Sequence, residues 1–286
     1  MTWLAYTLGA LCSFKLLGTF NLIVYFIGYV ALFLIEFATV VSNEYYDYET
    51  DKINKNYSQF TGGSRMIVEG NISFNQAKTA ILTSLILVFI LMIFLTIMYN
   101  IYTILILSIG VILGLAYTSP PIKFSYRGLG EMDVAVTHSF YIVLAGFLLQ
   151  TPRIDIVLPW ILSIPIFFAV LGGIILAGIP DYKADRETGK RTLTVIFGKK
   201  YVYLISSIAI MFSIICCIFL IYYKIIGFAS LFFLIAIIHG FALLYLLLVR
   251  SMSSVFENRI DKLLKLSLSY IIWFTLIPIL YLLNIF

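Results

Sequence analysis

Residues 43–51 read Asn-Glu-Tyr-Tyr-Asp-Tyr-Glu-Thr-Asp and close a long apolar run of the chain. Asn43, Asp47 and Asp51 recur at every fourth position, so on a continuous helix they share one face and form an oblique ladder of oxygen atoms. Two carboxylates four residues apart repel each other, and helix stability gives no reason to place them there. We therefore expect a positive ion or group between them.

A second pair with the same spacing, Asp181 and Asp185, closes another apolar run. Ionisable groups at the depth of a membrane helix are costly and usually face a cavity, a partner or an ion. Magnesium takes hard oxygen ligands and shares them with substrate phosphates, so it suits four carboxylates in one region. The alternative is a solvated helix end in which Asp51 pairs with Lys55. The cost of membrane acids favours the metal site.

The composition indicates a polytopic membrane protein. Of the 286 residues, 62% are hydrophobic and 12% are charged, whereas soluble domains have roughly 45–50% apolar and about 25% charged residues. The two histidines and three cysteines all lie in apolar runs, which favours buried side chains over a zinc site or a disulfide. We predict an all-α single domain, residues 1–286, with about nine transmembrane helices. The predicted helices are 2–18, 21–48, 74–98, 101–118, 132–150, 155–180, 201–222, 226–249 and 264–285.

The basic residues orient these helices. Sixteen of the 19 lysines and arginines fall on the side that holds the loops after helices 21–48, 101–118, 155–180 and 226–249. Cytoplasmic loops carry the excess of Lys and Arg, so this side is predicted to be cytoplasmic. Both acidic pairs fall on it. The net charge of +5 suits a membrane surface and an anionic substrate, but the orientation signal explains it equally well.

Glycines and basic residues follow each acidic pair. Paired glycines at 62 and 63 leave backbone N–H groups free to approach an anion, and an arginine fork can hold a phosphate with two hydrogen bonds. The segment Gly-Lys-Arg-Thr at 189–192 follows the second pair. The orientation rule is the alternative explanation for each cation. The candidate anion-binding residues are Gly62, Gly63, Ser64, Arg65, Lys123, Lys190 and Arg191.

Two tyrosines are candidates to stabilise a carbocation through a ring face. Tyr46 interleaves with the acidic ladder, and Tyr117 precedes the Thr-Ser-Pro-Pro break that ends the helix 101–118. Packing and anchoring at the membrane interface explain either tyrosine equally well.

Together these motifs resemble the UbiA-type superfamily of intramembrane aromatic prenyltransferases along nearly the whole chain. The stretches Thr-Gly-Gly-Ser-Arg at 61–65, Tyr-Thr-Ser-Pro-Pro-Ile-Lys at 117–123 and Tyr-Arg-Gly-Leu-Gly-Glu at 126–131 are most similar to the menaquinone-pathway branch, which prenylates 1,4-dihydroxy-2-naphthoate. The chain departs from the family pattern at Glu44, where Asp is commoner, and at Ala177 and Gly178, where an Asn often precedes the second acidic pair.

The resemblance implies a ring or horseshoe of helices around a central cavity, open sideways to lipid. The implied reaction is magnesium-dependent transfer of a polyprenyl group from a prenyl diphosphate to an aromatic acceptor. Two Mg²⁺ ions, for which Mn²⁺ can substitute, would bridge the diphosphate, and the basic residues would neutralise the remaining charge. The implied metal ligands are Asn43, Asp47, Asp51, Asp181 and Asp185.

The sequence is compatible with several alternatives. The acceptor could instead be 4-hydroxybenzoate, homogentisate, a tetrapyrrole or a glycerophosphate lipid. A cation-coupled transporter is the non-enzymatic alternative, because transporters also use carboxylates inside the membrane. A CDP-alcohol phosphotransferase is disfavoured, because its motif needs an Asp-Gly dipeptide that is absent from this sequence. No nucleic acid and no obligate protein partner is expected.

Overall fold

The computed structural model describes residues 2–253 and 260–285, and all of its regular elements are helices apart from one isolated bridge between Ser58 and Thr61. In these residues seven helical segments are long and apolar enough to cross a membrane. They are α2 (Leu22–Tyr46), α4 (Phe74–Met98), Gly130–Gln150, α8 (Leu158–Glu187), α10 (Lys199–Tyr222), Gly227–Ser251 and α12 (Asp261–Leu282).

Two of the seven segments are composite, and shorter helices complete the fold. Two of the shorter helices, α1 (Thr2–Leu17) and α5 (Tyr102–Ala116), are apolar. The composite segments consist of α6 (Gly130–Val136), the π-helical turn η2 (Thr137–Tyr141) and α7 (Ile142–Gln150), and of η3 (Gly227–Phe232) and α11 (Phe233–Ser251). The remaining helices are α1 (Thr2–Leu17), α3 (Tyr48–Ile53), α5 (Tyr102–Ala116), η1 (Phe124–Tyr126) and α9 (Leu193–Phe197).

The predicted all-helical membrane fold is confirmed, but in the described residues seven of the nine predicted spans reach full length, because α1 and α5 are shorter. Two further differences lie at the acidic motifs. Helix α8 continues to Glu187 instead of ending at 180, because loss of apolar character does not by itself interrupt backbone hydrogen bonding. Helix α2 ends at Tyr46, and Asp47 (φ −97°, ψ 6°) separates it from α3. The acidic ladder is therefore not on one uninterrupted helix. The i→i−4 bonds nevertheless continue, from Asp47 N to Asn43 O (2.8 Å) and from Asp51 N to Asp47 O (2.9 Å).

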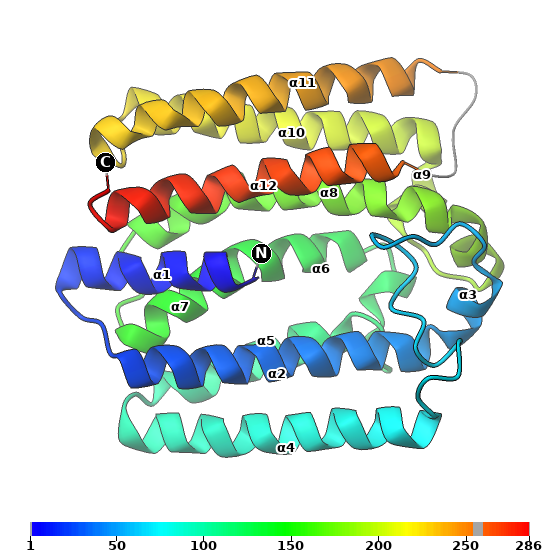
Figure 1. The fold of residues 1–286 in the computed structure, drawn as a ribbon, viewed down its shortest axis with the longest axis horizontal. Coiled ribbons are helices and arrows are strands. Elements are labelled where there is room, and N and C mark those ends of the chain that lie inside the picture. Colours follow the sequence, from blue (N-terminus) through cyan, green and yellow to red (C-terminus); the bar gives the residue numbers. More distant parts are fainter. Residues whose placement is uncertain (1, 254–259, 286) are drawn as a thin grey trace.

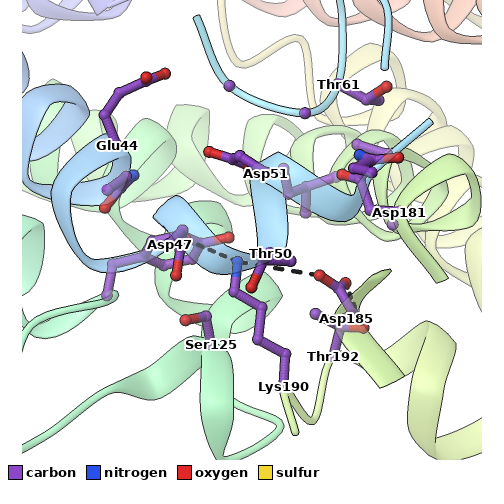
Figure 2. A pocket seen from close by; sticks show the side chains of 18 of the residues that line it. Glu44, Asp47, Thr50, Asp51, Thr61, Ser125, Asp181, Asp185, Lys190 and Thr192 are labelled. Atoms are coloured by element: carbon purple, nitrogen blue, oxygen red, sulfur yellow. Dashed lines mark hydrogen bonds and ion pairs between the residues drawn. The ribbon is translucent and has the colours of Figure 1, made fainter. Parts of the chain in front are cut away.

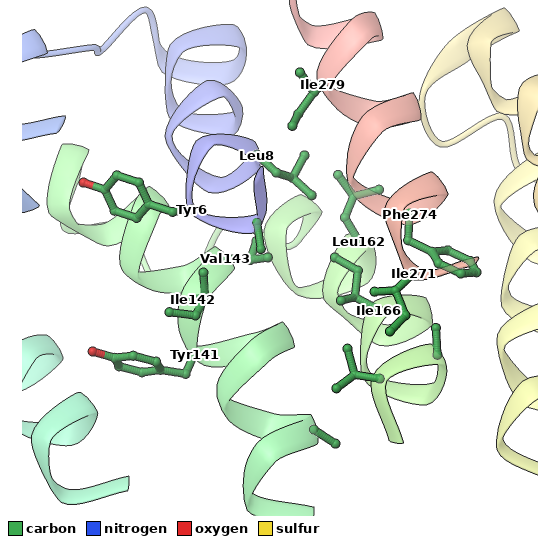
Figure 3. Close-up of a cluster of buried hydrophobic side chains, with 14 of the residues drawn as sticks. Tyr6, Leu8, Tyr141, Ile142, Val143, Leu162, Ile166, Ile271, Phe274 and Ile279 are labelled. Carbon is green, nitrogen blue, oxygen red and sulfur yellow. The ribbon is translucent and has the colours of Figure 1, made fainter. Parts of the chain in front are cut away.

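The long helices lie side by side, and the polar connections gather at one end, beside α3 and α9 (Figure 1). Helix α2 packs on α4, α1 on α7, and α8 on both α10 and α12. Buried side chains of α1, α7, α8 and α12 form the core between them (Figure 3). On the outside, α4 leaves aliphatic side chains such as Ile97 exposed, as suits a lipid-facing helix.

A close crossing fixes α1 against α7. A Cβ atom added to Gly9 would lie 1.9 Å from the carbonyl oxygen of Val143, and one added to Gly146 would lie 2.0 Å from that of Tyr6. Each helix thus presents a glycine to the other backbone. Small residues at such crossings let membrane helices gain van der Waals contact. This contact packs the short helix α1 against α7, the part of the composite segment Gly130–Gln150 that lies away from the acidic end of the bundle (Figure 1).

Candidate active site

The two acidic motifs meet at the polar end of the bundle (Figure 2). A cavity of about 300 Å³ is lined by all four aspartates, by Asn43 and by Lys190. The first two aspartates come from the junction of α2 and α3, and the other two come from the last turns of α8. Segments more than 130 residues apart in the chain thus share one chamber.

Burial of the carboxylates argues against the solvated helix end. Asp47, Asp51 and Asp185 keep 6%, 8% and 4% of their surface exposed. Burial raises the pKa of Asp51 to about 7, Lys190 acts to lower it, and the nearby charge of Asp47 raises it further. Like charges in a confined, desolvated space need a cation, and this is the environment that the sequence spacing predicted.

Direct hydrogen bonds join the two motifs. The Asn54 amide on the α3 side donates to Asp181 Oδ1 at 2.7 Å, and the hydroxyls of Thr50 and Thr188 are 2.8 Å apart. The family pattern often has an amide just before Asp181 in the chain, where this protein has Gly178. Here an amide reaches the carboxylate from the opposite motif instead.

Lys190 lies between the two motifs. Its Nζ is 2.7 Å from Asp47 Oδ2 and 4.0 Å from Asp185 Oδ1, and all three side chains are buried. Burial by itself lowers the pKa of Lys190, but the charges of Asp47 and Asp185 outweigh it and raise the pKa above its ordinary value. Lys190 therefore stays protonated and neutralises part of the acidic cavity.

Glu44 holds the glycine-rich loop against this cavity. Its Oε1 accepts hydrogen bonds from the backbone N–H groups of Ser64 and Arg65, the latter at 2.9 Å. Gly63 has φ +68°, and a Cβ there would lie 2.8 Å from Glu44 Oε1 and 3.1 Å from Asp51 Oδ2. Only glycine gives both this backbone conformation and this close approach. The carboxylate at position 44 thus fixes the loop through Oε1, and its Oε2 is buried without a hydrogen-bond partner among the described residues.

A second carboxylate, Glu131 of α6, holds the loop that carries Lys190. Its Oε1 accepts a hydrogen bond from Leu193 N at 2.8 Å. On the other side of that loop, the hydroxyl of Thr192 donates to Asp185 Oδ2 at 3.2 Å. Each acidic motif is thus accompanied by a loop that is held by one buried glutamate.

Only some of the predicted site residues line the cavity. Gly62, Gly63 and Tyr117 do, together with Asn43, the four aspartates and Lys190. Asn43 Oδ1 accepts the Thr118 hydroxyl at 2.6 Å, which leaves one lone pair of the amide oxygen for another partner. The predicted residues outside the lining are Tyr46, Ser64, Arg65, Lys123 and Arg191.

Local contacts explain where the outlying residues point. Arg65 donates from Nη1 to the Asp51 carbonyl at 2.6 Å and stacks 3.9 Å from the centre of the Tyr57 ring. The Lys123 ammonium lies 4.4 Å from the centre of the Tyr126 ring. Tyr46 lines a separate cavity between α2, α4 and α5. Arg65 therefore stabilises the backbone at Asp51, where the first acidic motif ends, and does not line the cavity.

Sequence reasoning missed several polar residues of the site. Thr50, Asn54, Thr192 and Glu131 all line the cavity. Tyr126 donates to Asp47 Oδ1 at 3.1 Å, and its burial together with the Asp47 charge raises its pKa to about 12. Glu131 and Tyr126 lie in a motif that carries the family resemblance, which was the one available signal. Partners from distant segments leave no mark on local periodicity.

The donor set fits a hard divalent cation. Residues 2–253 and 260–285 contain no group of three His, Cys, Asp or Glu side chains placed to hold one ion, and Lys190 lies between Asp47 and Asp185. The cavity nevertheless holds six carboxylates against one lysine. Carboxylate oxygens in that excess are the ligands that Mg²⁺ prefers, and the four aspartates are the residues that would hold it.

The fold and the site thus define an integral membrane protein with an acidic, metal-compatible cavity at one end of a helical bundle. The profile of the UbiA prenyltransferase family matches residues 3–282, and the chain belongs to this family. Its relatives include a digeranylgeranylglyceryl phosphate synthase from Saccharolobus solfataricus, 33% identical over 55% of this chain and 51% of the relative. A 1,4-dihydroxy-2-naphthoate octaprenyltransferase from Bacillus subtilis is 28% identical over 58% of this chain and 52% of the relative.

These two alignments span about half the length of each relative. A digeranylgeranylglyceryl phosphate synthase from Methanosphaera stadtmanae aligns over 91% of this chain and 83% of its own length, at 28% identity. Among solved structures, a UbiA homologue from Aeropyrum pernix K1 has a TM-score of 0.70 at 16% identity, covering 95% of this chain and 94% of its own. A UbiA homologue from Archaeoglobus fulgidus, bound to DMAPP and Mg²⁺, has a TM-score of 0.66 at 16% identity and covers 96% and 95%. These structural similarities support the shared fold.

Proposed function

We propose that this protein is a magnesium-dependent prenyltransferase that moves a polyprenyl group from a prenyl diphosphate to an aromatic acceptor within the membrane. The observation that carries this proposal is the convergence of four aspartates, Lys190 and a glycine-rich loop on one cavity. The Archaeoglobus fulgidus homologue, which holds DMAPP and Mg²⁺, supports the donor class. The chain is then one catalytic domain, residues 1–286.

Asp47, Asp51, Asp181 and Asp185, with Asn43 beside them, would hold two Mg²⁺ ions. When bound, these ions neutralise the diphosphate and promote departure of that group from the allylic carbon. The chain's own groups then orient the donor. Lys190 lines the cavity and would contact the diphosphate there, and the backbone at Gly62 and Gly63 lines the same space.

An apolar path for the prenyl tail leads away from this cavity. A neighbouring cavity of about 270 Å³ shares Phe60, Ile174 and Ala177 with the acidic one. Its other walls are mainly aliphatic side chains of α8 and α12, among them Leu264 and Ile271. Such a lining accommodates a hydrocarbon chain and excludes the water that would quench a carbocation.

The acceptor we favour is 1,4-dihydroxy-2-naphthoate. Its support is the pair of menaquinone-type stretches at 61–65 and 117–131, together with the Bacillus subtilis relative. A glyceryl phosphate acceptor is the second candidate, because the relatives from Saccharolobus solfataricus and Methanosphaera stadtmanae are digeranylgeranylglyceryl phosphate synthases. The excess of Lys and Arg on the loops around the site supports a reaction on the cytoplasmic side.

The test is an assay of purified protein with labelled geranylgeranyl diphosphate, Mg²⁺ and a panel that contains both acceptors. We expect a prenylated naphthoate and released diphosphate. Asp47→Asn and Asp181→Asn should abolish transfer without preventing insertion and folding. Asp155→Asn is the matched control, because Asp155 is exposed and pairs with Arg153 outside the cavity. Near-normal turnover in either cavity variant refutes the proposed site. If only the glyceryl phosphate yields a prenylated product, the second candidate is the acceptor.

A further inference from the structure

A second cavity adjoins the acidic one inside the bundle. It has a volume of about 280 Å³ and shares Val40, Asn43, Tyr117 and Ile174 with the acidic cavity. Among the described residues, no Lys or Arg lines it. Its titratable lining groups are Glu36, Tyr117, Asp133, His138 and Tyr141.

A π-helical turn builds one wall of this second cavity. The turn η2, Thr137–Tyr141, lies between α6 and α7 in an otherwise α-helical span. Thr137, His138 and Tyr141 of this turn line the cavity. A π-turn widens a helix at a cost in hydrogen-bond geometry and occurs frequently at functional sites. Opposite it, Gly110 leaves room for the Tyr141 hydroxyl, because a Cβ there would lie 2.0 Å from that oxygen.

Two polar atoms of this wall are buried without a protein partner. Asp133 Oδ1 and Thr137 Oγ1 have almost no solvent-exposed surface. Neither atom forms a hydrogen bond with any of the described residues. Asp133 as a whole is only 9% exposed, and it lines the cavity. Leaving a buried carboxylate oxygen unpaired is costly, so its presence calls for a partner that the fold does not supply.

The tautomer of His138 is determined by its backbone contact. His138 Nδ1 lies 3.1 Å from the carbonyl oxygen of Val134. Because a carbonyl oxygen only accepts, Nδ1 carries the hydrogen, and the neutral ring then has its lone pair on Nε2. His138 and Asp133 therefore both act as hydrogen-bond acceptors. Glu36, whose Oε1 accepts the Thr2 hydroxyl at 3.2 Å, adds a third acceptor to the same cavity.

We propose that this second cavity binds the hydroxyl-bearing edge of the acceptor, with Asp133 and His138 accepting its hydrogen bonds. A cavity with two carboxylates and no described cation favours a neutral donor group and disfavours a carboxylate or a phosphate. An anionic substituent of the acceptor would then point away from this wall. The shared residues Asn43 and Tyr117 place the acceptor next to the chamber where the prenyl group is released. This inference rests on the proposed function.

The experiment separates binding from turnover. Binding of 1-naphthol and of 1-methoxynaphthalene, which have the same ring but differ in the donated hydrogen, is measured by calorimetry on purified protein in detergent. We expect the wild type to prefer the naphthol, and Asp133→Asn and His138→Gln to lose about 10- to 100-fold of that preference, as for a hydrogen bond to a charged or ring acceptor. In turnover of Asp133→Asn, KM for the acceptor should rise by a similar factor while KM for the prenyl diphosphate stays unchanged; His138 also lines the apolar cavity proposed for the prenyl tail, so its variant is assessed by binding alone.

His239→Gln is the matched control, because the only other histidine is bonded to Leu266 O and Trp273 Nε1 on the α11–α12 side. Equal affinity of the wild type for both naphthalenes overturns the inference. So does a rise in both KM values by the same factor in the Asp133 variant. If the wild type prefers the naphthol but transfers no prenyl group to any acceptor, the proposed function fails while the cavity assignment stands.

Discussion

Replacing Lys190 by methionine tests the electrostatics of the acidic cavity most directly. Methionine keeps an unbranched stem of similar length and removes the charge. At the 2.7 and 4.0 Å separations from Asp47 and Asp185, an effective dielectric constant of about 20 gives attractions of about 6 and about 4 kcal/mol. Desolvation of the lysine offsets much of this. Removing one partner of a buried ion pair typically costs about 3–5 kcal/mol.

The loss should be near the low end of that range, because carboxylates beside a cavity can take up a proton when their cation is removed. A loss of about 3 kcal/mol corresponds to a fall of about 5 °C in Tm for a chain of this size. Mg²⁺ can replace the missing charge and no longer competes with the ammonium group. The Tm increase that Mg²⁺ produces should therefore be larger in Lys190→Met than in the wild type.

The assay is thermal unfolding of both proteins in detergent across a Mg²⁺ titration, with a chelator as the zero point. Lys200→Met serves as the control, because it removes one exposed positive charge from the same side of the protein. The reasoning is refuted if Lys190→Met unfolds at the wild-type temperature without Mg²⁺. It is equally refuted if Mg²⁺ raises Tm by the same amount in both proteins.

Three further predictions follow from the same geometry. A chelator should abolish prenyl transfer and either Mg²⁺ or Mn²⁺ should restore it, whereas full turnover in chelator would exclude a metal held by the four aspartates. Glu131→Ala should release the loop at Leu193 N and raise KM for the prenyl diphosphate about 10- to 100-fold, as loss of a supporting hydrogen bond does at metal sites. Glu131→Gln should recover most of that affinity, and an equal loss in both variants would contradict the positioning role. Because the pKa of Asp51 is raised to about 7, protons should compete with Mg²⁺ below that pH. The Mg²⁺ concentration for half-maximal activity should then rise up to about tenfold per pH unit below 7 and stay constant above 8; a pH-independent requirement would show that Asp51 binds no metal.

The acidic pairs could be found from sequence because their spacing is a local signal. Asp47, Asp51, Asp181 and Asp185 stand at fixed intervals at the ends of apolar runs, and the cost of such acids in a membrane marks them as exceptional. The supporting residues gave no such signal. Asn54 and Glu131 are ordinary polar residues until the fold brings them to Asp181 and Leu193.

Proximity along the chain was a weaker guide to side-chain direction. Arg65 follows the glycine pair, yet its guanidinium bonds the Asp51 carbonyl and stacks on Tyr57. Tyr46 is adjacent to Asp47, yet it lines a different cavity. Neighbours on a helix point in directions about 100° apart, so adjacency to a site residue does not place a side chain in the site.

The sequence alone determined the membrane class, the helical segments and the two acidic ends of this protein. Hydropathy and charge asymmetry are sums over local residues, and each residue contributes its transfer free energy independently of the fold. The tertiary structure decided the rest: the break at Asp47, the pairing of Lys190 with both motifs, and the π-turn that presents His138. The Lys190–Asp47 pair depends on atoms that meet only after segments more than 130 residues apart have packed together, and the break at Asp47 and the π-turn are backbone irregularities that hydropathy does not register. The acidic motif that begins at Asn43 is therefore one half of the site. No local sequence pattern could predict the position of the other half relative to it.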